Sequence, residues 1–198
     1  MNALTLQSFK TKPSGPQARL GCGLPLLDGF LGGGLPWGKL VEWGAPTGQE
    51  GWSLILPFVA QASRKGLCLW VGAEDRRQPF APSWIQAGVK PERMLFLGCA
   101  KPLKEAKEVF PHPLVRLILL DGPKGLRNED LAYLSTQARL TGKLILLVRP
   151  HFLSEKRGNV WAALRFNGWR RQRTGDWVLR CLKGPLAAEV RLPAEGGS

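Results

Sequence analysis

The chain has 198 residues, 44% of them hydrophobic, which suits one α/β domain with a buried core and argues against wholesale disorder. Its 28 lysines and arginines against 15 aspartates and glutamates give a formal net charge of +13. This excess favours a polyanionic partner, nucleic acid before an anionic membrane surface, although a basic surface that meets only solvent stays open. We recognise no signal peptide and no membrane-spanning run, so we expect a cytoplasmic, nucleoid-associated protein without membrane contact.

The N-terminal part begins with polar residues and then turns apolar. Residues 1–20 contain Pro13 and Pro16 and are expected to form a flexible arm. The run KLVEW (39–43) predicts a strand that ends at Gly44, and the apolar run 52–66 predicts a helix. Pro57 lies inside this helix and is tolerable only within its first turns.

The middle of the chain alternates apolar runs with helical patterns. Strands are expected at 67–74, 93–98, 115–122 and 143–150, and helices at 79–89, 102–110 and 128–142. The last helix has Asn128 as an expected N-cap and Gly142 as its stop. Strands that are apolar throughout and alternate with helices predict a mostly parallel twisted sheet with helices on both faces.

The C-terminal part changes character. VWAALRF (160–166) has helical apolar spacing and predicts a helix, followed by antiparallel edge strands within residues 176–192. We expect a single α/β domain over residues 21–192 and a disordered tail over 193–198. The four cysteines, Cys22, Cys68, Cys99 and Cys181, lie far apart without a C-x-x-C pair, so they are expected to act as small apolar residues and to bind no metal.

The segment GAPTGQEGWS (44–53) has the position and glycine content of a phosphate-binding loop, but it contains no lysine. A working loop offers backbone N–H groups to the phosphates, a lysine to the β- and γ-phosphates, and a hydroxyl to magnesium. Counted forward from Gly44, the lysine position is Glu50 and the hydroxyl position is Gly51; counted back from the helix, the two positions are Gly51 and Trp52. The residues of this degenerate loop are Gly44, Thr47, Gly48, Glu50 and Gly51.

Charge argues against nucleotide turnover at this loop. A carboxylate about 4 Å from a triphosphate is repelled by several kcal/mol at an effective dielectric near 20. Glu74 and Asp121 stand at strand ends, where an ATPase has a catalytic base and a magnesium ligand. Without the lysine we favour their interpretation as polar strand ends, and we expect no catalytic residue, no cofactor and no metal ion.

Several of these segments together resemble the core of the RecA recombinase. The run LGCGLPLLDGFLGGGLPWGKLVEWGAP (20–46) resembles the entry to that core, LCLWVGAE (67–74) the strand that ends in the catalytic glutamate, and VRLILLDG (115–122) the Walker B strand. The chain is most similar to ImuA-type proteins, which often carry a glutamate in place of the loop lysine, followed by an L-x-L-P helix; here these are Glu50 and LILPFVAQ (54–61). The likeness covers roughly residues 18–185, and many members of that family are longer.

The resemblance implies a RecA-like fold without nucleotide turnover and a role in damage-induced translesion synthesis and mutagenesis. The implied partners are DNA at stalled replication sites, an ImuB-like relative of the Y-family polymerases, an error-prone replicative-type polymerase and, as a further candidate, RecA. Two alternatives stay open. One is a DNA-dependent ATPase in which Lys39 or Lys65 supplies the missing cation, and the other is a SulA-like division inhibitor.

Residues 149–183 are strongly basic, with tryptophans interleaved. Cations that neutralise phosphates beside rings that stack on bases are the components of a single-stranded DNA surface. The segment HFLSEKRGN (151–159) follows a strand at the place of the second DNA-binding loop of RecA. The predicted DNA contacts are Arg149, Lys156, Arg157, Arg165, Arg170, Arg171 and Arg173.

Overall fold

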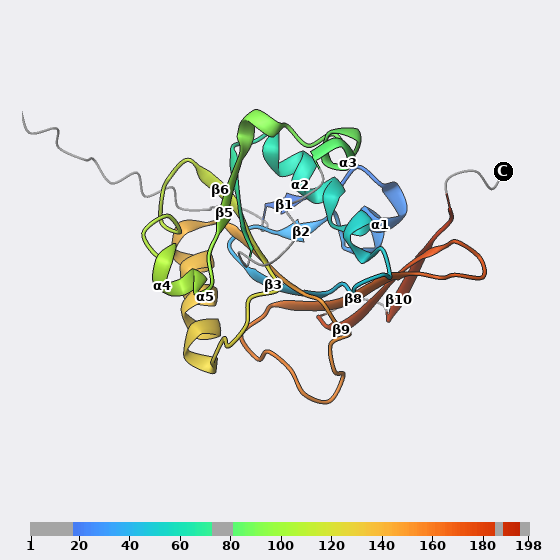
Figure 1. Cartoon of the computed structure of the whole chain (residues 1–198). Coiled ribbons are helices and arrows are strands. Elements are labelled where there is room, and N and C mark those ends of the chain that lie inside the picture. The colour runs from blue at the N-terminus through green and yellow to red at the C-terminus, as the bar shows by residue number, and fades with distance from the viewer. Residues whose placement is uncertain (1–17, 73–80, 185–187, 195–198) are drawn as a thin grey trace, which may run out of the picture.

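The computed structural model describes residues 18–72, 81–184 and 188–194 (Figure 1). Four predictions therefore lie wholly or partly outside the described residues. These are the arm at residues 1–20, apart from its last three residues, the acidic strand end at Glu74, the first two residues of the helix at 79–89, and most of the tail at 193–198.

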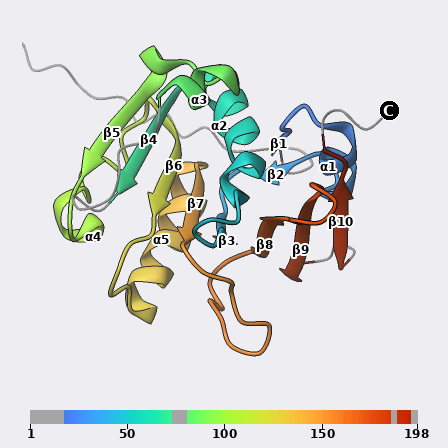
Figure 2. The same ribbon diagram turned by 45° about the vertical axis from the view of Figure 1, so that its right-hand side comes forward.

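An eight-stranded sheet forms the centre of the molecule, in the order β10-β9-β8-β3-β7-β6-β4-β5 (Figure 2). Its strands are β3 (Leu40–Gly44), β4 (Leu67–Gly72), β5 (Met94–Gly98), β6 (Val115–Asp121), β7 (Leu144–Arg149), β8 (Leu164–Arg170), β9 (Trp177–Lys183) and β10 (Glu189–Leu192). The strands from β5 across to β8 pair in parallel, whereas β9 and β10 pair antiparallel. The predicted mostly parallel sheet with antiparallel C-terminal strands is confirmed.

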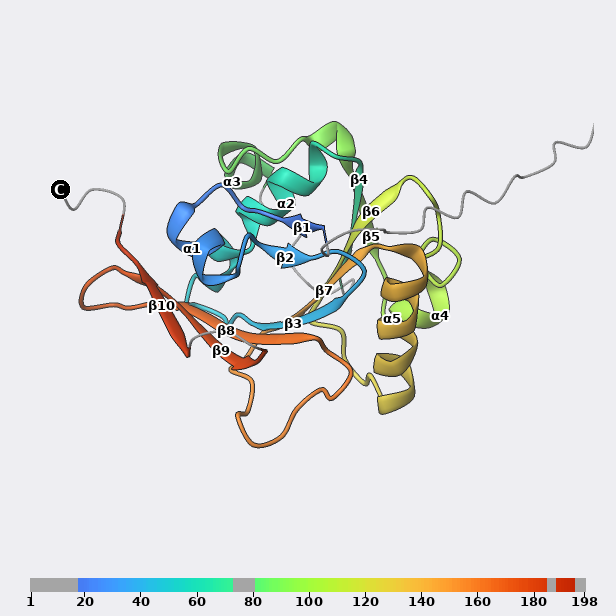
Figure 3. The same cartoon turned by 180° about the vertical axis from the view of Figure 1, so that it is seen from behind.

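Helices cover both faces of the parallel part of the sheet. They are α1 (Pro25–Phe30), α2 (Leu56–Ser63), α3 (Ala81–Gln86), α4 (Pro102–Glu105) and α5 (Asn128–Thr141), with 3-10 turns η1 (Gly51–Leu54) and η2 (Pro91–Arg93). A small antiparallel pair, β1 (Arg19–Leu20) and β2 (Leu35–Pro36), lies beside α1 and α2. Figure 3 shows α5 and α4 on the face opposite α2.

Side-chain alternation divides the core into two layers. Along β3, Val41 and Trp43 pack with α1 and α2, whereas Leu40 points into the layer that α5 covers. Trp43 is fully buried between Phe58 of α2 and Phe166 of β8, with ring centroids 6.2 and 5.2 Å apart. Because this period of two fixes the face of every residue, it also places Glu42 on the α5 side of the sheet.

The predicted helix at 160–166 is wrong. Residues 160 and 161 lie in a turn, the Ala163 N–H donates to the Leu40 carbonyl at 2.8 Å, and Leu164 begins β8. The apolar residues in this run follow both a helical and an alternating period, and pairing with β3 satisfies the backbone of a strand. The helix predicted at 102–110 is also shorter, ending at Glu105.

The predicted starts and stops of helices α2 and α5 are partly confirmed. Pro57 lies in the first turn of α2, as the prediction required, because a 3-10 turn precedes the helix. Gly142 ends α5 with a left-handed φ of 67°. The N-cap of α5 is Arg127, one residue before the predicted Asn128, and the Arg127 N–H donates to the Asp130 carboxylate at 2.8 Å.

Cys22, Cys68 and Cys99 are buried, and burial raises the pKa of the Cys22 and Cys68 thiols to about 12. Over the described part of the chain, no helix has the length and apolar character needed to cross a membrane. In the same part, no group of three or more His, Cys, Asp or Glu side chains could hold a metal ion.

Lys143 predicts a specific pH dependence of stability. It is 3% exposed, its ammonium group donates to the His112 carbonyl at 2.6 Å, and burial lowers its pKa from 10.5 to about 8. Between these two values the unfolded chain binds a proton at Lys143 that the folded chain has released, so the contribution of Lys143 to the free energy of unfolding rises with pH, opposite to that of the buried Cys22 and Cys68 thiols above about pH 9. Lys143→Met should remove this rise, on the order of 1 kcal/mol per pH unit at most, in urea unfolding at pH 8, 9 and 10.

The matched control is Lys90→Met, at an exposed position. It should keep the pH profile of the parent protein. Identical profiles for the parent and Lys143→Met would contradict this account of the buried ammonium group.

Candidate functional site

Residues 44–51, called the glycine loop below, lie between β3 and η1 and border a hollow of about 300 Å³. Its lining residues are Ala45, Pro46, Thr47, Gly48, Glu50, Gly51, Trp52, Asp121, Val148 and Pro150. Of the described residues, no lysine or arginine is part of this lining, whereas Glu50 and Asp121 both are. The described lining of the hollow thus contains two acidic residues, of which Glu50 is paired with Arg170.

The backbone of the glycine loop is occupied within the protein. The Thr47 N–H faces the Pro150 carbonyl at 3.5 Å, and the Gln49 N–H donates to the Pro46 carbonyl at 3.1 Å. The chain continues into a four-residue 3-10 turn, so no regular α-helix begins directly at the loop. A phosphate-binding loop needs free backbone amides and the N-terminus of an α-helix. Here two of the amides face carbonyls, and a 3-10 turn stands in place of the first helical turn.

Two glycines of the loop are required by packing against β8. A Cβ on Gly51 would lie 2.4 Å from the Gly168 carbonyl, and a Cβ on Gly44 would lie 2.3 Å from the Asn167 side-chain oxygen. The Arg170 N–H also donates to the Gln49 carbonyl at 2.9 Å. Close approach of β8 therefore accounts for Gly44 and Gly51, whereas Gly48 has open space around it and a positive φ of 79°.

Glu50 is held by a cation from β8. Its carboxylate lies 3.0 Å from the Arg170 guanidinium, with the two side chains 55% and 41% exposed. Its φ of 52° makes it the one described non-glycine residue with a positive φ. Arg170 also donates to the Gly175 carbonyl at 2.9 Å and lies 5.3 Å from the centre of the Trp177 ring. An exposed pair of this kind contributes at most about 1 kcal/mol, so it orients Arg170 more than it stabilises the fold.

A second carboxylate, Glu42, is buried in the sheet between two arginines. It is 4% exposed and lies directly opposite Arg165 of β8 in the strand register. Its two oxygens accept from Arg165 at 3.0 Å and from Arg149 of β7 at 3.2 Å. Strand parity brings all three side chains to the same face, beyond the end of α5.

Arg165 and Asn167 also fix residues 150–163, called the β7–β8 loop below. Arg165 donates to the carbonyls of Ser154 and Arg157 at 3.1 and 3.3 Å, and the Asn167 side-chain oxygen accepts from the Leu153 N–H at 2.7 Å. Gly158 lies against the guanidinium, where a Cβ would come within 2.1 Å of its atoms. The loop thus has a defined course along the outer face of β8, as Figure 3 shows below the sheet.

The outer surface of this region combines cations with aromatic rings. Lys156 and Arg157 are exposed on the β7–β8 loop. Phe152, which is 51% exposed, meets the Trp169 ring edge-on at 5.6 Å, and the Arg180 guanidinium lies 5.6 Å from the same ring centre. Single-stranded nucleic acids bind to surfaces with this composition.

The seven arginines and lysines predicted to contact DNA fall into three groups. Lys156 and Arg157 lie exposed on the β7–β8 loop, and Arg171 and Arg173 lie exposed on the turn between β8 and β9. Arg149 and Arg165 differ from the prediction, because they turn inward and neutralise Glu42. Arg170 lies between these groups, half-exposed and paired with Glu50. The interface proposed below leaves out Arg149 and Arg165.

Two functional positions were not predicted from the sequence. Glu42 could have been suspected, because a charged residue within an apolar strand needs a buried partner. Phe152 gave no such signal, because a single aromatic residue in a loop is not part of a repeating apolar pattern. The predicted acid at Asp121 does line the hollow of the glycine loop.

No model of a known protein family matches the chain, and no curated protein matches it significantly.

Replacement of Arg165 tests the buried cluster. Arg165→Met should lower the free energy of unfolding by about 3–5 kcal/mol, because Glu42 loses one of its two cations and two loop carbonyls lose a donor. Arg180→Met is the matched control. Its ion pairs with Glu155 and Glu189 are partly exposed, so the loss should stay below about 1 kcal/mol. Urea unfolding measures both, and equal losses would contradict the distinction.

Proposed function

We propose that this chain is a non-catalytic, RecA-like accessory factor that binds single-stranded DNA during damage-induced translesion synthesis. The proposal combines the resemblance of residues 18–185 to ImuA-type proteins with the properties of the glycine loop and of the basic surface. Its partners are an ImuB-like polymerase relative and an error-prone replicative-type polymerase, with RecA as a further candidate. Membrane lipid is not among them.

The state of the glycine loop is the observation that carries the proposal. Binding of a nucleoside triphosphate requires cations and free amides around the phosphates. Here the described lining of the hollow holds Glu50 and Asp121 without a basic residue, and Arg170, which lies beside the loop, is engaged by Glu50. The amides of Thr47 and Gln49 face carbonyls. This arrangement supports a scaffold role over turnover.

The basic surface supports DNA as the polyanion. Arg149 and Arg165 are largely buried and engaged by Glu42, so their guanidinium groups are not available for contact with a polyanion. The β7–β8 loop carries the exposed cations Lys156 and Arg157 and the exposed rings of Phe152 and Trp161, and the cations of the β8–β9 turn line one hollow with Trp169. Lys156 and Arg157 would neutralise phosphates of a single strand, while the exposed rings stack on its bases.

A nucleotide titration tests the absence of turnover. With magnesium and millimolar ATP, with or without single-stranded DNA, calorimetry should detect no binding, because the triphosphate meets carboxylates in place of cations. A hydrolysis assay should show no release of phosphate. DNA-stimulated hydrolysis that disappears in Glu74→Gln would instead establish the ATPase alternative.

The salt dependence of DNA binding tests the other half of the proposal. Four exposed cations, Lys156, Arg157, Arg171 and Arg173, would release about three counterions from a single strand, giving a log-log slope near −3. Fluorescence anisotropy with a labelled oligothymidylate at 50–300 mM salt measures this slope. A flat response would remove DNA from the proposal, and inhibition of FtsZ polymerisation without DNA affinity would favour the SulA-like alternative.

A further inference from the structure

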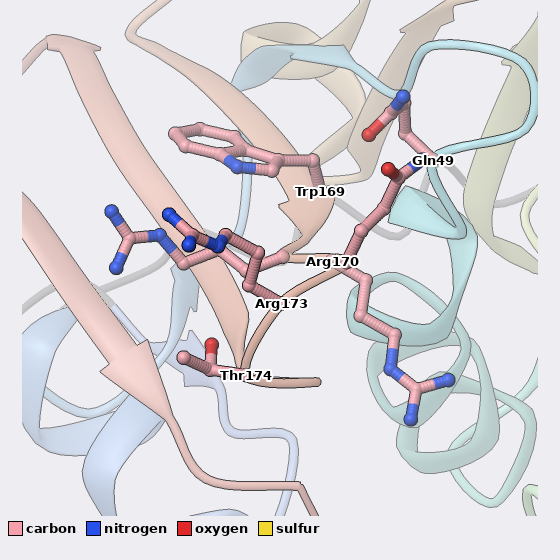
Figure 4. Close-up of a pocket in the computed structure, with 7 residues that line it drawn as sticks. Gln49, Trp169, Arg170, Arg173 and Thr174 are labelled. Atoms are coloured by element: carbon pink, nitrogen blue, oxygen red, sulfur yellow. The ribbon is translucent and has the colours of Figure 1, made fainter.

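A second, larger hollow lies at the turn between β8 and β9, and a smaller hollow lined by Glu50, Arg170 and Arg171 connects it to the glycine loop. Its volume is about 610 Å³, and its lining residues are Gln49, Trp169, Arg170, Arg171, Gln172, Arg173 and Thr174 (Figure 4). In this described lining there is no carboxylate, in contrast to the hollow at the glycine loop. The site therefore combines three guanidinium groups, an indole, two carboxamides and a hydroxyl.

The turn that forms this hollow has a fixed backbone. Within residues 171–176, the Arg171 N–H donates to the Asp176 carbonyl and the Gly175 N–H donates to the Arg171 carbonyl, both at 2.8 Å. Gly175 adopts a left-handed φ of 74°. The bond from the Arg170 N–H to the Gln49 carbonyl attaches the turn to the glycine loop. A site on such a turn is formed before any ligand arrives.

The three arginines have different availability. Arg170 is engaged by Glu50 and Gly175, and in Figure 4 it points away from the Trp169 side of the turn. Arg171 and Arg173 are exposed, and no ion pair within the described residues holds either guanidinium. Two available guanidinium groups beside an aromatic ring match a ligand that carries both a phosphate and a planar ring.

We propose that this hollow binds one nucleotide unit, with its phosphate on Arg171 and Arg173 and its base against the Trp169 indole. The inference rests on the proposed single-strand binding and names the place where one nucleotide is held. Gln49, Gln172 and Thr174 supply hydrogen-bonding groups to the base edge and the sugar.

The lining favours a nucleotide over an acidic peptide. Arginine clusters bind acidic peptides as well, so the indole of Trp169 beside the guanidinium groups is what favours a nucleotide, whose base can stack on the ring. Trp169 also contacts Phe152 and Arg180, so the hollow adjoins that part of the surface.

Competition experiments distinguish the sources of the nucleotide. The probe is labelled dT10, displaced by dT10 with a 5′-phosphate, dT10 without one, dTMP or polyglutamate. Displacement by both oligonucleotides at similar concentrations identifies a nucleotide within a strand. A clear preference for the phosphorylated form identifies a strand terminus, and displacement by dTMP identifies a free nucleotide. Polyglutamate competing as well as the oligonucleotides would overturn the proposal.

Variants locate the site. Arg171→Ala/Arg173→Ala, and separately Trp169→Ala, should each weaken dT10 binding about 10-fold or more at 100 mM salt. The control is Arg93→Ala/Arg139→Ala, which removes the same charge from exposed positions on η2 and α5 and should change affinity less than about threefold. Glu50→Gln should raise affinity by up to about fivefold, because it removes a negative charge next to Arg171, without any gain of ATP hydrolysis.

The outcomes separate this inference from the proposed function. If the turn variants bind dT10 as tightly as the control while binding stays salt-dependent, the nucleotide is held elsewhere and the proposed function stands. If the parent protein binds neither dT10 nor dTMP, both proposals fail. Circular dichroism spectra and urea midpoints equal to those of the parent verify that each variant is folded.

Discussion

The ion cluster of Glu42 with Arg149 and Arg165 joins strands β3, β7 and β8 near the β7–β8 loop. Three adjacent strands, β3, β7 and β8, each contribute one of its members. Arg149 also donates a hydrogen bond to the Pro123 carbonyl after β6, and Arg165 donates one to the Ser154 carbonyl after β7. Burial of a charge costs several kcal/mol unless a partner compensates. Because each member would be an uncompensated buried charge without the others, the cluster fixes both the strand register and the course of the β7–β8 loop.

This internal neutralisation also decides where the positive charge of the protein acts. The two arginines that Glu42 engages are turned inward, whereas Lys156 and Arg157 on the β7–β8 loop and Arg171 and Arg173 on the β8–β9 turn stay exposed on the surface. The ring of Phe152 lies on the same loop that Arg165 anchors. Structural and surface arginines thus have separate tasks, although they alternate within a short stretch of sequence.

The sequence predicted those features whose cause is local. Apolar runs gave the parallel strands, and Gly142 gave the end of α5, because burial and backbone conformation leave a local pattern. The strand that begins at Leu164 was not predicted, because the apolar residues before and after it fit both a helical and an alternating period. Arg165 would also be expected at the surface from its charge. The partners of Arg165 and Arg170 lie 123 and 120 positions away, at Glu42 and Glu50, and no local pattern encodes a contact over that distance.

The glycine loop shows how packing can produce a sequence that resembles a binding motif. Residues 44 and 51 must be glycine because β8 leaves no room for a Cβ there. The Gln49 carbonyl accepts a hydrogen bond from the Arg170 N–H. A lysine at position 50 would face Arg170, with which it would share a charge of the same sign, and the Thr47 and Gln49 amides would still face carbonyls. Restoring one residue therefore does not restore a phosphate cradle, because the loop is shaped by its contact with β8 and that contact would remain.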